Sequence, residues 1–434
     1  HPDAVPSERP SASNFNPTDL GGAAEESDSS ESIDSVARID LGRRYPDTGL
    51  STTEIEFRLK HPWEPFGSVD DFKLAQHFVA ANTSKNCITS YFNKGLHKPT
   101  VAGFRSGQTL HNKIAQMDEA PPRFFSGTVQ AGNETYTYLY RDPIECAKYL
   151  IGCPAYNGDL TYQPAEDINE AGERVFSEMH TGDWWIQFQD KLPEDDILVP
   201  IICASDETQL TVFSGDKRAY PAYITIGNLS STVRSKPSKL GYLLLALLPV
   251  PPNTSGMTAA EKSAYHTKVQ TITKTAMSHI FSPLKDISPP DRGSHTLRCA
   301  DGKLRRCWPV LCGWVGDHPE HSKLQGTKYN CCPRCEVDRE ELGVMLSHQD
   351  LDELQRDSME YHEAFTAIDD STERESWFNM RNARSVENIF WTIPPYNAYF
   401  LPRPDLLHTV HLGITRHLIE WVLDFLRRHS RLKN

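Results

Sequence analysis

Two aspartates stand where strand-like runs of the sequence end. The stretch LVPIICASDETQL (198–210) turns from apolar residues to Asp206 and Glu207, and CWPVLCGWVGD (307–317) ends in Asp317. Carboxylates at the ends of neighbouring strands can share Mg²⁺ or Mn²⁺, and two such ions roughly 4 Å apart activate a water or a 3′-hydroxyl in phosphoryl transfer. The plainer interpretation is a strand end that reaches solvent, because burying an unpaired charge costs several kcal/mol.

A cysteine pair at metal-ligand spacing follows in NCCPRCEVDREELG (330–343). Cys332 and Cys335 form a C-x-x-C knuckle that can place both thiolates on one Zn²⁺ at about 2.3 Å. The predicted other half of this site is His408 and His411, one helical turn apart. Other possible ligands are Cys331, Cys312, His318 and His321. The alternatives without metal are reduced core thiols and ordinary helix histidines.

Local basic patches, rather than total charge, are the candidate DNA contacts. The formal net charge is −13, but residues 1–40 hold nine acidic side chains against two basic ones. Clustered lysine and arginine set a phosphate footprint. The predicted contacts are Lys217, Arg218, Arg234, Lys236, Lys239, Arg305 and Arg306. Trp184 and Trp185 could stack on bases, although adjacent tryptophans more often belong to a core.

The elements that position the two aspartates follow an α/β pattern. Strands are predicted at 199–205, 222–227, 241–250 and 307–317. Pro200 is placed at the start of its strand, because proline removes a ladder donor. Thr258 and Glu261 form a capping box for a helix between the third and fourth strands, in which apolar residues repeat at helical spacing. This order is expected to bring Asp206 and Asp317 together at one rim of the sheet.

The rest of the chain is expected to be divided by composition and periodicity. The predicted parts are an acidic, Ser/Pro-rich disordered tail (1–45), a helical N-terminal domain (46–125), a hairpin and helix region (126–195), an α/β core (196–330), and a Cys/His knuckle that leads into a helical insertion (331–434). In the helical domain, Phe72, Ala75, Phe78 and Val79 share one face, with Ser68 or Asp70 as the cap.

Several classes of protein are excluded or disfavoured. No apolar run reaches the roughly 18 residues that a membrane span needs. The chain starts at His1 with neither an initiator Met nor a signal-peptide pattern, so it is expected to be part of a longer protein. Six of the ten cysteines fall between Cys299 and Cys335, which fits metal binding in a reducing compartment better than a secreted disulfide framework.

Seven motifs in order resemble one family over roughly residues 60–430. They are MHTGDWW, VPIICASDETQLTVF, YPAYITIGNL, SKPSKLGYLLLALLP, GWVGDHPE, CPRCEVDREELG and PDLLHTVHLGITRHLIEWV. The sequence is similar to the Plavaka-type transposases of fungal genomes, relatives of the Kyakuja-Dileera-Zisupton and CACTA-like elements. The resemblance implies an RNase H-like mixed sheet over 196–330, with an acidic DDE triad that cuts element ends and joins them to target DNA.

The same resemblance assigns roles to particular residues. Asp206 is similar in position to the first acidic residue and Asp317 to the second, both as ligands of Mg²⁺ or Mn²⁺. Asp405-x-x-His408 resembles a signature that follows the second carboxylate in several such superfamilies. The implied partners are transposon ends and target DNA, with a homo-oligomer as the full-length form and the nucleus as the place of action.

The chain departs from the family pattern at the third acidic residue. That residue usually follows a long helical insertion, and Glu420 comes too early to be it. The chain is therefore expected not to catalyse transposition alone, because two ligands position metal poorly. One alternative is a domesticated or relic, zinc-stabilised DNA- or chromatin-binding protein without catalysis. Another is a plain interaction protein with an acidic tail.

Overall fold

The computed structural model describes residues 65–100, 103–114, 121–210, 218–252, 256–287, 292–342, 344, 347–393 and 397–429. The predicted acidic tail (1–45) and Lys217 lie outside these ranges. Among the helices within them, none is long and apolar enough to cross a membrane.

The described ranges contain α-helices, short 3₁₀ turns and one π-helical segment outside the central sheet. The α-helices are α3 (Val69–Ala80), α4 (Lys85–Asn93), α5 (Gly107–Ile114), α6 (Pro143–Gly152), α7 (Asp183–Gln189), α8 (Ser231–Arg234), α9 (Ala259–Phe281), α10 (His318–Gln325), α11 (His348–Glu353), α12 (Ser358–Ala367), α13 (Ser371–Met380) and α14 (Arg416–His429). Short 3₁₀ turns are η2 (Pro154–Tyr156), η3 (Met179–Thr181), η4 (Pro237–Lys239), η5 (Ser282–Asp286), η6 (Arg339–Glu341), η7 (Ile389–Thr392) and η8 (Ala398–Phe400). A π-helical segment, η9 (Leu407–Thr415), leads directly into α14.

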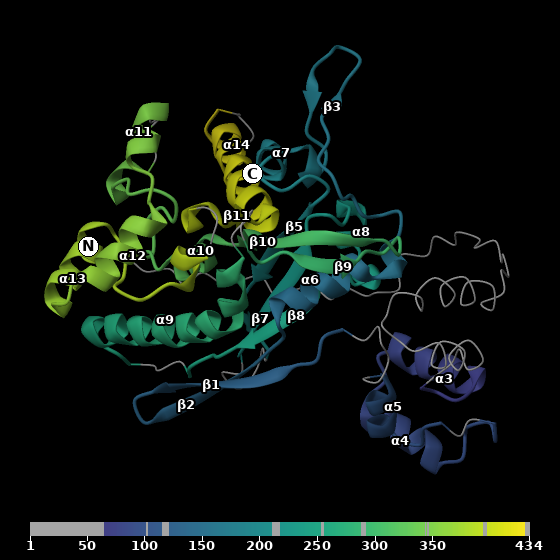
Figure 1. The fold of residues 1–434 in the computed structure, drawn as a ribbon. Coiled ribbons are helices and arrows are strands. Elements are labelled where there is room, and N and C mark those ends of the chain that lie inside the picture. The colour runs from purple at the N-terminus through teal and green to yellow at the C-terminus, as the bar shows by residue number, and fades with distance from the viewer. Residues whose placement is uncertain are drawn as a thin grey trace. The chain divides into compact units, whose positions relative to one another are not determined.

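One curled mixed sheet forms the centre of the α/β fold (Figure 1). Its strands are β1 (Phe125–Ala131), β2 (Glu134–Tyr140), β5 (Ile197–Ser205), β6 (Thr208–Gln209), β7 (Arg218–Ile226), β8 (Leu243–Leu248), β9 (His295–Arg298), β10 (Leu304–Gly316) and β11 (Pro402–Pro404). They run in the order β1-β2-β8-β7-β5-β10-β11, while β6 pairs with β7 and β9 with β10. A separate two-stranded sheet joins β3 (Asp167–Ile168) to β4 (Arg174–Val175).

The middle of the sheet changes direction at β5. Strand β5 pairs antiparallel with β7, and β7 pairs antiparallel with β8. On its other side β5 pairs parallel with β10, which pairs parallel with β11. The carboxyl ends of β5, β10 and β11 therefore meet at one edge. This mixed α/β arrangement confirms the predicted fold class.

The position of Pro200 corrects the prediction for β5. The strand begins at Ile197, so Pro200 lies inside it and pairs in register with Val310 of β10. Pairing with β7 starts only at Ile201, and the Pro200 carbonyl accepts a hydrogen bond from the Gly227 nitrogen at 2.7 Å. The missing N–H of proline thus falls where no β7 ladder bond is required.

Helix α9 packs against the hairpin strands and supplies part of the core. Thr258 and Glu261 form the predicted capping box, in which the Thr258 side chain accepts from the Glu261 nitrogen and Glu261 binds back to the Thr258 nitrogen. The predicted apolar face is buried from Ile272 onward, through Ala276 and Ile280. The amino-terminal half of the helix is more exposed.

Helices α3, α4 and α5 have a core of their own. It consists of Phe66, Ala75, Phe78, Ile88, Phe92, Phe104 and Leu110. Ser68 is the N-cap of α3 and accepts a hydrogen bond from the Asp71 nitrogen. Val79 was predicted on the buried face but is exposed, because it follows Phe78 by one position and turns away from that core.

Two further predictions concern the region before β5. The hairpin β1–β2 turns at Gly132, whose φ of +65° suits glycine.

Trp185 of α7 is fully buried, and Trp184 packs its ring on Phe188 at 5.4 Å between centroids. The core interpretation of this tryptophan pair therefore holds, since Trp185 offers no exposed face to a base.

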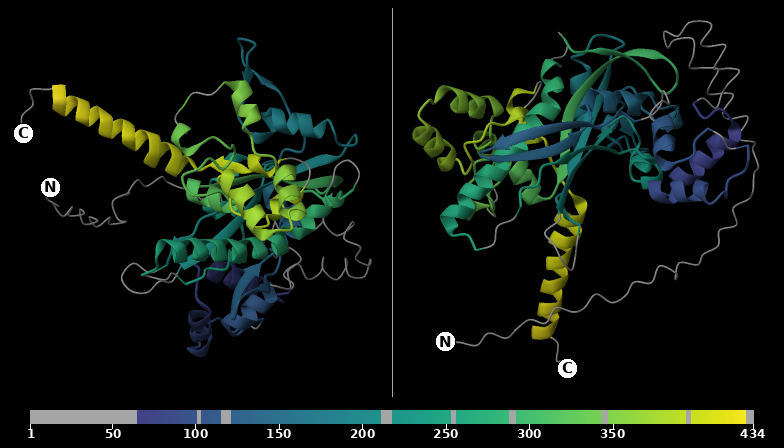
Figure 2. Two further views of the ribbon diagram at one scale, coloured as in Figure 1. Left: turned by 90° about the vertical axis from the view of Figure 1, so that its left-hand side faces the viewer. Right: turned by 90° about the horizontal axis from the view of Figure 1, so that it is seen from below.

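The segment η9–α14 presents its apolar residues to solvent. None of its described residues is buried, and the exposed set includes Ile414, Leu418, Trp421, Phe425 and Leu426. Figure 2 shows α14 projecting from the elements that precede it. This helix begins close to the carboxyl ends of β10 and β11.

Candidate active site at the carboxyl edge of the parallel strands

Asp206 and Asp317 each follow the last residue of a parallel strand. Strand β5 ends at Ser205 and β10 at Gly316. Ala204 pairs in register with Val315, and Asp206 and Asp317 each follow their member of this pair by two residues. Neighbouring strands are about 4.8 Å apart, so this register brings the two aspartates side by side at one edge.

Asp405 extends the acidic edge to a third strand. Its backbone nitrogen donates to the Gly316 carbonyl at 3.1 Å, and Pro404 pairs in register with Gly316. Asp405 therefore lies beside Asp317, as the residue that directly follows β11. An aspartate therefore directly follows each of three neighbouring parallel strands.

His408 lies over this edge and is held by Asp405. Its Nδ1 bonds to Asp405 Oδ2, and Asp405 Oδ1 accepts from the Leu407 nitrogen at 2.7 Å. The hydrogen bond to Asp405 raises the pKa of His408, and the charges of Asp317 and Asp206 raise it further. For Asp405, burial is the largest single effect and raises the pKa, but the bond from the His408 ring, the backbone donors of Leu407 and His408 and the charge of His408 together leave the pKa lowered.

Asp317 also has a structural role. It is the N-cap of α10, where its Oδ1 accepts from the Glu320 nitrogen at 2.8 Å. This bond fixes the orientation of the Asp317 carboxylate, which is half-buried, while Asp206 is exposed. The Glu207 carboxylate forms ion pairs with Arg218 and with Lys323, the latter at 3.0 Å, and is therefore not a candidate metal ligand.

A buried polar network lies directly beneath the two strand ends. Glu320 is 2% exposed and accepts hydrogen bonds from the Ser205 and Tyr220 hydroxyls. The Trp314 indole nitrogen donates to the Ser205 hydroxyl at 2.8 Å. Burial raises the pKa of Glu320, against the opposing effect of Lys323. The network ties β5, β7, β10 and α10 together at the level of the aspartates.

Lys274 of α9 is a second buried ionisable group near this network. Burial lowers its pKa to about 7, while the charge of Glu320 acts in the opposite direction. Its Nζ donates to the Leu324 carbonyl at the end of α10. Neither Glu320 nor Lys274 was identified from the sequence. The Asp-x-x-Glu spacing at the start of α10 is the signal that could have pointed to Glu320.

The predicted zinc ligands do not converge in this structure. Burial raises the pKa of the Cys335 thiol, and the adjoining Cys332 thiol contributes to the same shift, so the pair is close. His408 instead bonds to Asp405, and His411 is exposed on η9. In the described ranges no group of three or more His, Cys, Asp and Glu side chains is arranged to hold a metal ion.

The other proposed zinc ligands have separate surroundings. Cys312 lies within β10, where its thiol donates to the Ile201 carbonyl at 3.1 Å. His321 is buried against the Trp314 carbonyl at 3.2 Å. Cys331 is also buried, and His318 is exposed with its ring near Tyr329.

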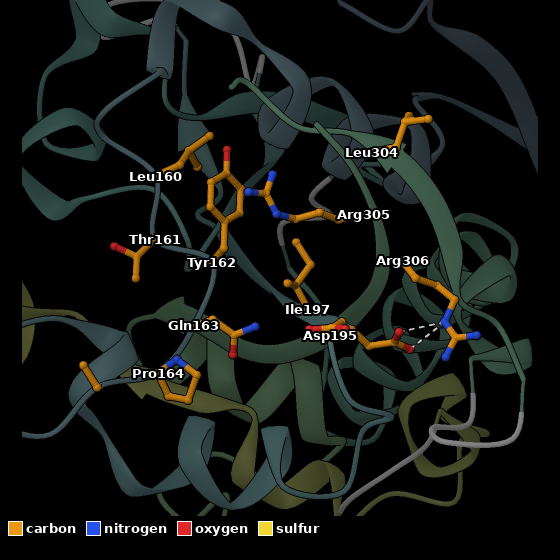
Figure 3. A pocket seen from close by; sticks show the side chains of 12 residues that line it. Leu160, Thr161, Tyr162, Gln163, Pro164, Asp195, Ile197, Leu304, Arg305 and Arg306 are labelled. Atoms are coloured by element: carbon orange, nitrogen blue, oxygen red, sulfur yellow. Dashed lines mark hydrogen bonds and ion pairs between the residues drawn. The ribbon is translucent and has the colours of Figure 1, made fainter. Parts of the chain in front are cut away.

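Most of the predicted DNA contacts are engaged in ion pairs. Arg234 pairs with Glu178 at 3.5 Å. Arg305 makes a bidentate bond to Asp301, and Arg306 bonds to Asp196 (Figure 3). The pocket of Figure 3 is lined by Ile197 and Leu304, the first residues of β5 and β10. It therefore lies at the ends of these strands opposite to the aspartates.

Lys236 and Lys239 remain as exposed cations. Lys236 is the N-cap of the η4 turn and Lys239 is its last residue, and within the described chain neither forms an ion pair. Glu420, which was not expected to be the third acidic residue, lies exposed on α14 and pairs with Arg416 at 3.0 Å and His417 at 3.5 Å.

The fold and the acidic edge together define an α/β protein with a candidate active site at the carboxyl ends of parallel strands. Residues 104–422 match the family model described as Plavaka transposase. The match spans most of the chain, so the chain belongs to the Plavaka transposase family. Among curated proteins, no sequence matches it. Membership of a transposase family implies DNA binding.

Proposed function

We propose that this chain carries the catalytic core of a cut-and-paste DNA transposase, in which Asp206 and Asp317 hold Mg²⁺ or Mn²⁺ for DNA strand cleavage and strand transfer. The observation that supports this most strongly is the register of β5 with β10, which matches Ala204 to Val315 and so sets the two aspartates at one edge. Family membership supplies the class of substrate, which is DNA.

The donor set fits these ions by its chemistry. Carboxylate oxygens are hard ligands, and Mg²⁺ keeps positions for water and substrate phosphate when protein carboxylates supply only part of its shell. Bound ions would activate the attacking oxygen and stabilise the leaving one. Asp206 is exposed and open to substrate, whereas Asp317 is oriented by its bond to the Glu320 nitrogen.

His408 is proposed to act on the substrate side of the same edge. Because its pKa is raised by Asp405, Asp317 and Asp206, it carries positive charge to a higher pH than an ordinary histidine. A protonated imidazole there can hold a phosphate oxygen of the strand being cut. Asp405 fixes the ring through Nδ1, which leaves Nε2 as the donor toward substrate.

Further contacts are proposed beyond this edge. Lys236 and Lys239 are exposed and are proposed to contact DNA phosphates. Zn²⁺ is proposed at Cys332 and Cys335. Since the substrate is element and target DNA, we place the activity in the nucleus and expect a homo-oligomer.

The test is metal-dependent cleavage of duplex DNA that contains the element ends. Transposition by this chain alone is not expected, so the readout is weak single-strand nicking with Mg²⁺ or Mn²⁺, which D206N or D317N should each abolish. D424N is the matched control, because Asp424 is a half-buried aspartate on α14 that pairs with Arg428 at 2.6 Å and does not follow β5, β10 or β11. Binding of the same DNA without any metal-dependent nicking would favour the alternative of a domesticated, non-catalytic DNA-binding protein.

A further inference from the structure

A cavity of about 510 Å³ opens beside the acidic edge, between the start of α10 and the η9–α14 segment. Its lining residues include Asp317 and His408, which also belong to the candidate active site. An occupant of this cavity therefore lies next to the proposed metal ligands. Its volume falls in the range of about 300–1,000 Å³ that is common for small-ligand sites.

One wall of the cavity is aromatic. The rings of His417 and Trp421 stack with centroids 6.3 Å apart and an interplanar angle of 25°. Trp421 is 69% exposed, so much of its ring surface is accessible within the described chain. Ile414 and Pro319 add apolar surface. Flat aromatic faces of this kind stack on nucleobases of any sequence.

The rim of the cavity is polar on the side that faces the aspartates. Thr409 and His318 line it together with His408. The side chains of Thr409 and His318 can hydrogen-bond the edge of a base or the sugar of a nucleotide. A purely apolar peptide segment would leave them unpaired, so a nucleotide fits this combination of walls better.

We infer that this cavity holds the unpaired nucleobase of a DNA strand end whose phosphate lies at Asp206 and Asp317. The inference rests on the proposed function, because that function places the phosphate. Taking a base out of the stack positions the adjoining phosphodiester, and stacking on an aromatic ring offsets the cost of unpairing. Trp421 is the stacking residue, and His417 supports its ring.

The experiment uses the full chain and a short oligothymidylate that carries one 2-aminopurine at its 3′ end, with Ca²⁺ to avoid cleavage. Stacking quenches 2-aminopurine, so wild-type protein should quench it on binding. W421A should remove the quenching and weaken binding by about fivefold to a hundredfold, whereas W421F should keep most of both. F425A is the matched control, because Phe425 is 59% exposed on the same helix and does not line the cavity.

Three outcomes would overturn the inference. One is binding of the oligonucleotide without quenching. Another is an equal loss for F425A and W421A, which would mean that the apolar helix as a whole contacts DNA or a protein. The third is unchanged quenching in W421A. DNA nicking is measured separately. If W421A nicks DNA and quenches 2-aminopurine as wild type does, the base site is contradicted but the proposed catalysis is not. If quenching depends on Trp421 but the wild-type protein does not nick DNA, the proposed catalysis is contradicted but the base site is not.

Discussion

The backbone nitrogen of Asp405 donates to the carbonyl oxygen of Gly316 at 3.1 Å. This single bond continues the ladder between β11 and β10 by one residue and sets Asp405 beside Asp317. Because His408 is in turn bonded to Asp405, the imidazole is carried to the edge where β5 and β10 end. The position of His408 therefore follows from a strand of only three residues, Pro402–Pro404.

Replacing Asp317 separates its capping role from its proposed metal role. D317A removes the bond to the Glu320 nitrogen and should lower the free energy of unfolding by about 1 kcal/mol. D317N should preserve stability, because asparagine caps helices as well as aspartate does. Chemical denaturation measures both. Equal destabilisation by the two variants would contradict the capping assignment.

Glu320 is predicted to hold the floor of the acidic edge. E320A leaves the buried Ser205 and Tyr220 hydroxyls without their acceptor and should lower the free energy of unfolding by about 1–3 kcal/mol for each unsatisfied group. E320Q keeps an acceptor oxygen and should be milder. E340A, at an exposed glutamate, is the control and should be close to neutral in urea denaturation.

Lys274 should make stability depend on pH. Its pKa falls from 10.5 to about 7 on folding, so between these values the unfolded chain keeps a proton that the folded chain has lost. Stability from this group therefore rises with pH across that window, by up to about 1.4 kcal/mol per unit. K274M should remove this component. Parallel pH profiles for wild type and K274M would argue against a perturbed Lys274.

The pKa of His408 should depend on Asp405. In metal-free protein, D405N replaces the charged acceptor that does most to raise this pKa with a neutral amide, so the NMR titration midpoint of His408 should move toward the ordinary value of 6.5. In D405N, His408 should therefore lose its positive charge at a lower pH than in wild type. D424N provides the comparison, and an unmoved midpoint in D405N would show that the pair is not formed in solution.

The sequence predicted the local features whose signals are themselves local. The capping box at Thr258 and Glu261, the hairpin predicted within 126–195 and the apolar strand that ends before Asp206 depend on neighbours in sequence. Spacing and turn chemistry are enough to identify such elements. The order of the core elements along the chain, three strands, a helix and a further strand, followed from them.

The features that depend on tertiary pairing were missed. Strand β11 contains two prolines in three residues and has no strand signal of its own, so only pairing with β10 defines it. Glu320 reads as a solvent-exposed residue in a first helical turn, yet the hydroxyls of Ser205 and Tyr220 converge on it in the core. Pro200 was misplaced because its tolerance depends on where β7 begins to pair.

The most direct test of the account is a double-mutant cycle on Mn²⁺ affinity, measured by titration calorimetry for wild type, D206N, D317N and the double variant. If both carboxylates hold the same ions, each single change should weaken binding at least about tenfold, and the double variant should lose much less than the two losses combined. Independent, additive losses, or single variants that bind Mn²⁺ as wild type does, would contradict a shared metal site at the ends of β5 and β10.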